Sequence, residues 1–218
     1  LASLLQEASF DLVVSLFDHD ATFLNDLRDG SKKVLEIHFS RFKRLQYGRK
    51  RIVGQIDQYR SKQDLKLVQK FSRFVVLTEE DKSYWGDLAN IQVIPNANSF
   101  IPETYAELLN KQVIAVGRYD EQKQFSDLIR AWRLVADKAP DWVLKIYGHG
   151  PEKAMLQQLV EQLGLVQHIV LHPPVSNIEQ AYVDSSALAM TSKYEGLPMA
   201  LLEGQVCGLP LVAYACKC

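Results

Sequence analysis

Apolar residues in the second half of the chain form short continuous runs that alternate with longer stretches of helical spacing. Buried strands are predicted at residues 112–118, 142–150, 168–172, 187–192 and 209–214. Helices are predicted between them at residues 123–140, 151–164, 176–185 and 198–208. We expect Ser176 to cap the third of these helices. Apolar strands that alternate with helices in this way indicate an α/β fold with a parallel, doubly wound sheet.

The pattern in the first half is weaker. Strands are predicted at residues 10–17, 33–39 and 74–78 and just before Pro95, and one helix is predicted at residues 62–72. Pro95-Asn96 is a turn signal, so we expect two Rossmann-like domains, residues 1–98 and 99–218. The chain begins without Met and ends directly after a predicted strand. We therefore expect a piece of a longer protein, in which both domains are incomplete.

Composition excludes several classes of protein. With 218 residues, 47% of them hydrophobic and 23% charged, and a net charge of -1, the chain resembles an ordinary soluble protein and not a nucleic-acid-binding one. No apolar run approaches the ~20 residues that cross a bilayer. The cysteines Cys207, Cys216 and Cys218 lack the spacing of a disulfide framework or a zinc site, which favours a reducing, cytoplasmic location.

Polar residues follow the predicted strands of the second domain at the points where each strand ends. They are Arg118, Gly148 to Gly150, His172 to Pro174 and Thr191 to Pro198. Ligands of open parallel sheets bind outside the carboxyl ends of the strands. We therefore expect these residues to converge on one crevice.

The stretch "TSKYEGLPMALLEGQV" places one carboxylate in a loop, Glu195, and a second, Glu203, inside the following predicted helix. Between them, the amides of Gly196, Leu197 and Met199 lie at the N-terminus of that helix. Free N–H groups and the helix dipole make such an end an anion site. It suits a diphosphate.

The neighbouring charges extend this site. Arg118 and Lys123 could add charge-assisted hydrogen bonds to the phosphates. Glu203 could accept hydrogen bonds from a ribose, and Glu195 could bind hydroxyls of a group carried by the far phosphate. This is the order of groups in a nucleotide diphosphate sugar.

The same stretch resembles the E-x7-E signature of retaining GT-B glycosyltransferases of glycosyltransferase family 4. Three more segments are similar to that family: "VIPNANSF", "VGRYDEQKQFSDLIRAW" and "DWVLKIYGHGPEKAMLQQLVEQLGL". The resemblance covers most of the chain. It implies a GT-B fold, with an acceptor-side domain at residues 1–98 and a donor-binding domain at residues 99–218. The family's first strand and Gly-rich loop are missing, and Gly204 stands where the family usually has Ala.

The resemblance also implies roles for single residues. Glu195 and His38 would act on the transferred sugar, and the base would lie near Pro174 to Asn177. Donor binding would involve Arg118, Lys123, Glu203, Gly196, Leu197 and Gly117. The family needs no metal and no cofactor. The implied reaction transfers a sugar, with retention, from a UDP- or GDP-sugar to a hydroxyl of a cell-surface glycan, teichoic acid or lipid-linked precursor. Glu195 would act either as a nucleophile or by positioning the sugar, and we favour positioning.

Other interpretations remain open. The chain could be a nucleotide-sugar-binding module without catalysis. A Rossmann epimerase is disfavoured because its G-x-G-x-x-G motif is missing. His38 could be structural, and Asp18 to Asp20, which mimics the metal-binding motif of GT-A enzymes, is better explained as a turn. The basic run from Lys32 to Arg51 predicts either a solvated face or contact with an anionic membrane surface, such as the inner face of the plasma membrane.

Overall fold

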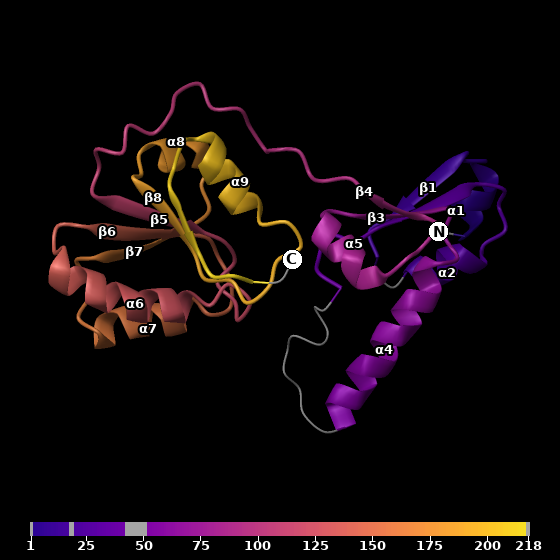
Figure 1. Ribbon diagram of the computed structural model, residues 1–218, viewed down its shortest axis with the longest axis horizontal. Coiled ribbons are helices and arrows are strands. Elements are labelled where there is room, and N and C mark those ends of the chain that lie inside the picture. The colour runs from indigo at the N-terminus through magenta and orange to yellow at the C-terminus, as the bar shows by residue number, and fades with distance from the viewer. Residues whose placement is uncertain (1, 18–19, 42–51, 217–218) are drawn as a thin grey trace. The chain divides into compact units, whose positions relative to one another are not determined.

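The computed structural model describes residues 2–17, 20–41 and 52–216, and these divide into two compact units (Figure 1). Ala97–Lys193 and Pro198–Cys216 form the second unit. The first unit contains the described residues up to Asn96, together with Tyr194–Leu197. The predicted domain boundary lies between residues 98 and 99, whereas the division by contacts follows Asn96. Each unit contains its own parallel sheet.

The first unit has a four-stranded parallel sheet in the order β1-β2-β3-β4. Its strands are β1 (Leu12–Ser15), β2 (Lys32–Glu36), β3 (Arg73–Val76) and β4 (Ile91–Val93), and all four overlap predicted strands. Its helices are α1 (Ala2–Glu7), α2 (Asp20–Asp26), α4 (Ile52–Val68) and α5 (Glu79–Trp85). The predicted helix at residues 62–72 corresponds to the end of the longer α4, and the three short helices were not predicted.

One buried carboxylate organises the carboxyl-end edge of this first sheet. Asp81 of α5 is 3% exposed and accepts hydrogen bonds from the backbone N–H of Arg41 at 2.9 Å and from Trp85 Nε1 at 3.1 Å. The Arg41 guanidinium lies 4.3 Å from the centre of the Trp85 ring, a cation–π contact. Burial raises the pKa of Asp81, and these hydrogen bonds oppose that rise. The contacts fix the backbone shortly after β2, where His38 lies.

The second unit has a five-stranded parallel sheet in the order β7-β6-β5-β8-β9. Its strands are β5 (Gln112–Val116), β6 (Val143–Tyr147), β7 (Ile169–His172), β8 (Ala187–Met190) and β9 (Leu211–Ala213). Its helices are α6 (Phe125–Lys138), α7 (Lys153–Gln162), α8 (Ile178–Val183) and α9 (Met199–Val206). Every predicted element of this half is confirmed. The predicted cap of α8 is wrong, because Asn177, and not Ser176, accepts the hydrogen bond from Gln180 N at 3.2 Å.

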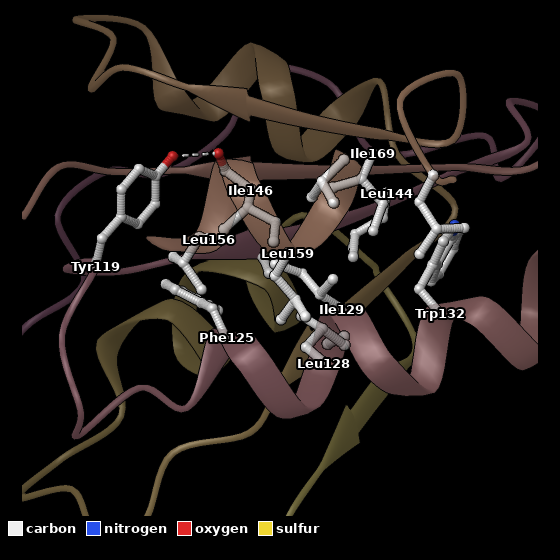
Figure 2. Packing of buried hydrophobic residues seen from close by; sticks show 14 of the residues in the cluster. Tyr119, Phe125, Leu128, Ile129, Trp132, Leu144, Ile146, Leu156, Leu159 and Ile169 are labelled. Atoms are coloured by element: carbon white, nitrogen blue, oxygen red, sulfur yellow. Dashed lines mark hydrogen bonds between the residues drawn. The ribbon is translucent and has the colours of Figure 1, made fainter. Parts of the chain in front are cut away.

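The helices of the second unit cover both faces of its sheet (Figure 1). Leu144 and Ile146 of β6 belong to a core cluster with α6 and α7, whereas Tyr147 belongs to a cluster with α8 and α9. This alternation follows from the two-residue period of a strand. Figure 2 shows the first cluster, in which Phe125, Leu128, Ile129 and Trp132 lie at helical spacing on α6.

The hydrogen-bond ladder continues past the strand ends into the loops. Gly117 N donates to Tyr147 O and Gly148 N donates to His172 O, both at 3.0 Å. The loops approach so closely that a Cβ added at Gly148 would lie 1.9 Å from Gly117 O. Only glycine fits this position, and it brings the ends of β5, β6 and β7 together.

A buried hydroxyl connects the same three strands. Tyr119 is fully buried in the loop after β5, and its hydroxyl lies 2.7 Å from both Ile146 O and His172 O (Figure 2 shows the first contact). Its one proton is donated to these two carbonyl oxygens in turn or shared between them. Burial raises the pKa of Tyr119 to about 12.

Tyr119→Phe should lower the free energy of unfolding by about 1–3 kcal/mol, because the carbonyl groups of Ile146 and His172 lose the hydrogen bond from this hydroxyl. The pKa of Tyr119 is about 12 in the folded chain and about 10 in the unfolded chain. Its contribution to stability is therefore complete below pH 10 and is lost as the pH rises through about 12. Urea titrations of both proteins should show a difference in unfolding free energy that shrinks as the pH rises from about 10 to about 12. A difference that stays constant would contradict this account.

Gly148→Ala should destabilise the second unit by at least about 1–3 kcal/mol, because the new methyl group meets a backbone oxygen that cannot move away. Gly204→Ala is the matched control. A Cβ there would lie 2.9 Å from Leu188 Cδ1, the end of a flexible side chain. The small cost of moving the Leu188 side chain offsets the gain of about 1 kcal/mol that alanine brings in helix propensity. Thermal unfolding should show a large loss for the first variant and little change for the second; equal shifts would be inconsistent with the loop packing.

Candidate functional site

A pocket of about 340 Å³ lies at the carboxyl-end edge of the second sheet. Arg118 and Glu203 both line it, although 85 positions separate them in the sequence. The remaining lining residues are Val116, Gly117, Tyr147, Gly148, His149, Pro174, Val175 and Ile178. Residues from three of the four strand ends singled out from the sequence, Arg118, Gly148, His149 and Pro174, thus meet at one pocket. Lys123 and the stretch from Thr191 to Pro198 are not among its lining residues.

The cationic side of the site comes from the loop after β5. The Arg118 side chain is 70% exposed, and its Nε lies 3.5 Å from Asp120 Oδ2. Lys123 is half-buried in the same loop, and a Cβ at Gly117 would lie 2.9 Å from its Cε. Gly117 therefore leaves room for the Lys123 side chain to lie across the loop. The exposed Arg118 guanidinium keeps donors available for a ligand.

This loop is held against the end of β8. Thr191 Oγ1 lies 2.9 Å from Lys123 O, and Lys193 N donates to Gln122 O at 2.8 Å. Asp120 Oδ1 accepts from Gln122 N at 3.1 Å, which closes the turn within the loop. The backbone that carries Arg118 and Lys123 is thus fixed on both sides.

The acidic side of the pocket is Glu203, a half-buried residue of α9. Its Oε1 accepts a hydrogen bond from Ser99 Oγ at 2.7 Å, and its Oε2 accepts one from the Tyr182 hydroxyl at 2.8 Å. Burial raises the pKa of Tyr182, and the Glu203 carboxylate raises it further. Burial and the carboxylates of Glu179 and Glu203 raise the pKa of Cys207 to about 11. The two groups beside the carboxylate are therefore neutral at physiological pH.

Sequence analysis missed Ser99 and Tyr182. Ser99 is 104 positions from Glu203 and Tyr182 is 21 positions away. Ser99 lies in the segment "VIPNANSF", but neither residue had been given a role by the sequence. The only signal in the sequence was that a carboxylate within an apolar stretch requires partners.

Two stacked rings form part of the apolar wall. Tyr147 and His172 have ring centres 4.5 Å apart and planes inclined by 9°. Burial, and then Lys145, lower the pKa of His172, so its ring is neutral at pH 7. Burial raises the pKa of Tyr147, with a further contribution from Asp184. The stack places a flat, uncharged surface behind the pocket, because Tyr147 lines it.

The remaining predicted residues group with the first unit. Glu195, Gly196 and Leu197 belong to the segment assigned to that unit, and Glu195 is 7% exposed. Within this unit a Cβ at Gly196 would lie 2.6 Å from His38 O, so a side chain at this position would meet the backbone. The His38 side chain is 42% exposed, and its Nε2 lies 3.3 Å from Glu36 Oε2.

Some predictions fall on residues that the structure does not describe. The turn predicted at Asp18 to Asp20 lies outside the described residues except for Asp20, which begins α2. In the basic run, residues 42–51 lie outside them as well. Across residues 2–17, 20–41 and 52–216, no three His, Cys, Asp or Glu side chains gather into a metal site. Of the helices described, none has both the length and the apolar composition to span a membrane.

Two comparisons of sequence bear on this site. A relative from Haemophilus influenzae named as an uncharacterized glycosyltransferase is 35% identical over 149 residues, which are 66% of this chain and 42% of the relative. The amylovoran biosynthesis glycosyltransferase AmsD of Erwinia amylovora is 36% identical over 156 residues, 66% of this chain and 44% of AmsD. The chain thus spans less than half the length of these relatives.

Solved structures confirm the predicted GT-B fold. TarM from S. aureus, crystallised with Fondaparinux, alpha-GlcNAc-glycerol and UDP, has a TM-score of 0.83 and 21% identity, over 100% of this chain and 44% of TarM. HepE from Anabaena, in complex with UDP and glucose, has a TM-score of 0.79 and 18% identity, over 99% of this chain and 62% of HepE. The family model described as "Glycosyl transferases group 1" matches residues 101–218. Since the matched residues make up more than half of this chain, the chain belongs to that glycosyltransferase family.

Proposed function

We propose that the second unit binds a nucleotide diphosphate sugar, and that the protein transfers the sugar with retention as a member of glycosyltransferase family 4. The observation that supports this most directly is the pocket that Arg118 and Glu203 share. It has a cation on one side and a hydrogen-bonded carboxylate on the other. Its volume of about 340 Å³ is at the small end of the usual range for small-molecule sites, about 300–1,000 Å³.

The nucleoside would occupy the apolar part of this pocket. Pro174, Val175 and Ile178 line it together with Tyr147. A base would lie against these residues, and the ribose hydroxyls would donate to Glu203. UDP, present in the crystals of TarM and HepE, supports uracil as the base, and GDP is the alternative.

The diphosphate would be held by Arg118 and Lys123 and by amides near the N-terminus of α9, among them those of Gly196 and Leu197. Charge-assisted hydrogen bonds from a guanidinium to phosphate are about twice as strong as neutral ones. These cationic and dipolar groups would stabilise the leaving diphosphate without a metal ion.

The reaction would break the bond between the anomeric carbon and the diphosphate oxygen and form a bond to the acceptor oxygen on the same face of the sugar. The acceptor's proton would move to the departing diphosphate. Glu195 would position the sugar through its hydroxyls, and His38 would approach the same sugar. The transition state would resemble the oxocarbenium ion of glycoside hydrolysis.

The acceptor would be a hydroxyl of a cell-surface glycan, teichoic acid or lipid-linked precursor. AmsD is named for amylovoran biosynthesis, and TarM was crystallised with alpha-GlcNAc-glycerol. These relatives support a glycan or glycerol-linked acceptor. Contact of the basic run from Lys32 to Arg51 with anionic lipid, on the inner face of the plasma membrane, would suit a lipid-linked one.

Glu203→Ala should weaken binding of UDP or GDP by about 10–100-fold, because a ribose loses a charged acceptor. Glu195→Ala should leave nucleotide binding unchanged and abolish sugar transfer. Calorimetry and a transfer assay with a panel of UDP- and GDP-sugars would measure both. Glu161→Ala, which removes an exposed carboxylate of α7 outside the pocket, is the matched control. Wild-type behaviour of both site variants would refute the assignment, and binding without any transfer by the wild type would favour the non-catalytic module.

Treatment with EDTA should leave nucleotide binding and transfer unchanged, because Arg118, Lys123 and the helix amides would supply the positive potential. Adding Mg²⁺ or Mn²⁺ back provides the comparison. Activity that disappears with EDTA and returns with either ion would disprove metal independence.

A further inference from the structure

We propose that Ser99 and Tyr182 are positioning residues that hold Glu203 for recognition of the ribose, so that this trio selects ribonucleotides over deoxyribonucleotides. The inference rests on the proposed donor site, because it takes Glu203 as the acceptor for the ribose hydroxyls. It adds two residues outside the pocket lining to the determinants of donor specificity.

The hydrogen bonds leave the carboxylate partly available. Ser99 Oγ donates to Glu203 Oε1 at 2.7 Å, and the Tyr182 hydroxyl donates to Oε2 at 2.8 Å. A carboxylate offers about four lone-pair sites, so about two remain for a ligand. Glu203 lines the pocket, whereas neither Ser99 nor Tyr182 does. The protein thus holds each carboxylate oxygen with a group outside the pocket lining and leaves the rest of its capacity for two ribose hydroxyls.

Tyr182 is a rigid donor. It is fully buried on α8, in the core cluster with Leu188 and Cys207, and its ring centre lies 6.2 Å from that of Phe100. Its hydroxyl stays protonated at physiological pH, because burial and the adjacent carboxylate both disfavour the phenolate. Because the ring is closely packed, its hydroxyl has a fixed position, and Glu203 can keep this hydrogen bond only in one orientation of its carboxylate.

Ser99 is exposed, yet the segment that carries it, residues 97–111, is attached to α8 and α9. Ala106 N donates to Cys207 O at 2.9 Å, just past the end of α9. Glu103 N donates to Glu179 Oε1 of α8 at 3.1 Å. Phe100 and Ala106 pack against the same core cluster as Tyr182. Ser99 is therefore held beside Glu203 by contacts on its C-terminal side.

Holding the carboxylate in advance changes which ligands bind well. A glutamate side chain gives up much of its rotamer freedom when a ligand orders it, and preorganisation removes that loss from the binding step. A ribose with two adjacent hydroxyls can use both remaining sites of a correctly oriented carboxylate, whereas a 2′-deoxyribose can use only one. Loss of either tether should therefore reduce affinity for the ribonucleotide more than affinity for its 2′-deoxy form.

Calorimetry of the full chain with UDP and 2′-deoxy-UDP, repeated with GDP and 2′-deoxy-GDP, tests this inference. Tyr182→Phe and Ser99→Ala should each weaken ribonucleotide binding by about tenfold and weaken deoxyribonucleotide binding much less. Tyr84→Phe is the matched control for the first variant, since Tyr84 also donates to a glutamate, Glu80, in the other unit. Ser83→Ala, which removes a hydroxyl that donates to Glu80 O, is the control for the second.

The possible outcomes separate the two proposals. Wild-type protein that binds none of the four nucleotides overturns the donor site and this inference with it. Wild-type binding with an equal loss for both sugar forms in the variants shows a merely structural role and overturns only this inference. Should Tyr182→Phe fail to fold by thermal unfolding, Ser99→Ala decides alone, since Ser99 is exposed and outside the core cluster. The inference is supported if the preference for ribonucleotides shrinks in Tyr182→Phe and Ser99→Ala and persists in Tyr84→Phe and Ser83→Ala.

Discussion

The carboxyl-end edge of the second sheet depends on the hydroxyl of Tyr119. It connects the loop after β5 to carbonyl groups of β6 and β7, and it does so from a fully buried position. Gly117 and Arg118, the two preceding residues, line the pocket. Residues 117 to 119 therefore lead directly from the pocket lining into the hydrophobic core. Gly148 allows its loop to lie against Gly117. The positions of Arg118 and of the apolar wall are therefore fixed by packing between the loops and not by the conformational preferences of each loop alone.

Charge within the pocket is arranged so that a diphosphate and a carboxylate can both be accommodated. Two negative groups in contact would repel each other strongly in a pocket, because bulk water does not screen their charges there. In the proposed complex the ribose separates the phosphates from Glu203, and Arg118 faces the phosphates. The two side chains that donate to Glu203, Ser99 and Tyr182, are uncharged, and the raised pKa of Cys207 keeps that neighbouring thiol uncharged as well. The hydrogen bonds from Ser99 and Tyr182 therefore do not neutralise the Glu203 carboxylate as a cationic partner would. In the proposed complex, the carboxylate would be a strong acceptor for a sugar hydroxyl.

The sequence predicted what depends on local periodicity and missed what depends on long-range contacts. The inner strands of the second sheet, β5, β6 and β8, appear as apolar runs because helices cover both faces of this parallel sheet. Helices α1, α2 and α5 have six or seven residues, too few to show a helical period. Helix α8 is as short, but it lies between two clearly predicted strands of an alternating pattern. The cap of α8 was placed one residue early because Ser176 and Asn177 are adjacent and both cap well. Ser99 and Tyr182 could not be predicted, since only the folded chain brings them to Glu203.

Glu195 and Glu203 depend on the structure in different ways, although only seven residues lie between them. Glu203 and every residue that lines its pocket belong to the second unit. Its proposed contribution to binding therefore requires only that this unit be folded. Glu195 groups with the first unit, as does His38. Their proposed contribution, to turnover, requires both units. Gly196 and Leu197, whose amides are proposed to help hold the diphosphate, group with the first unit as well. Nucleotide affinity should therefore be insensitive to changes of the Glu195 and His38 side chains, which leave those amides in place, whereas transfer should not.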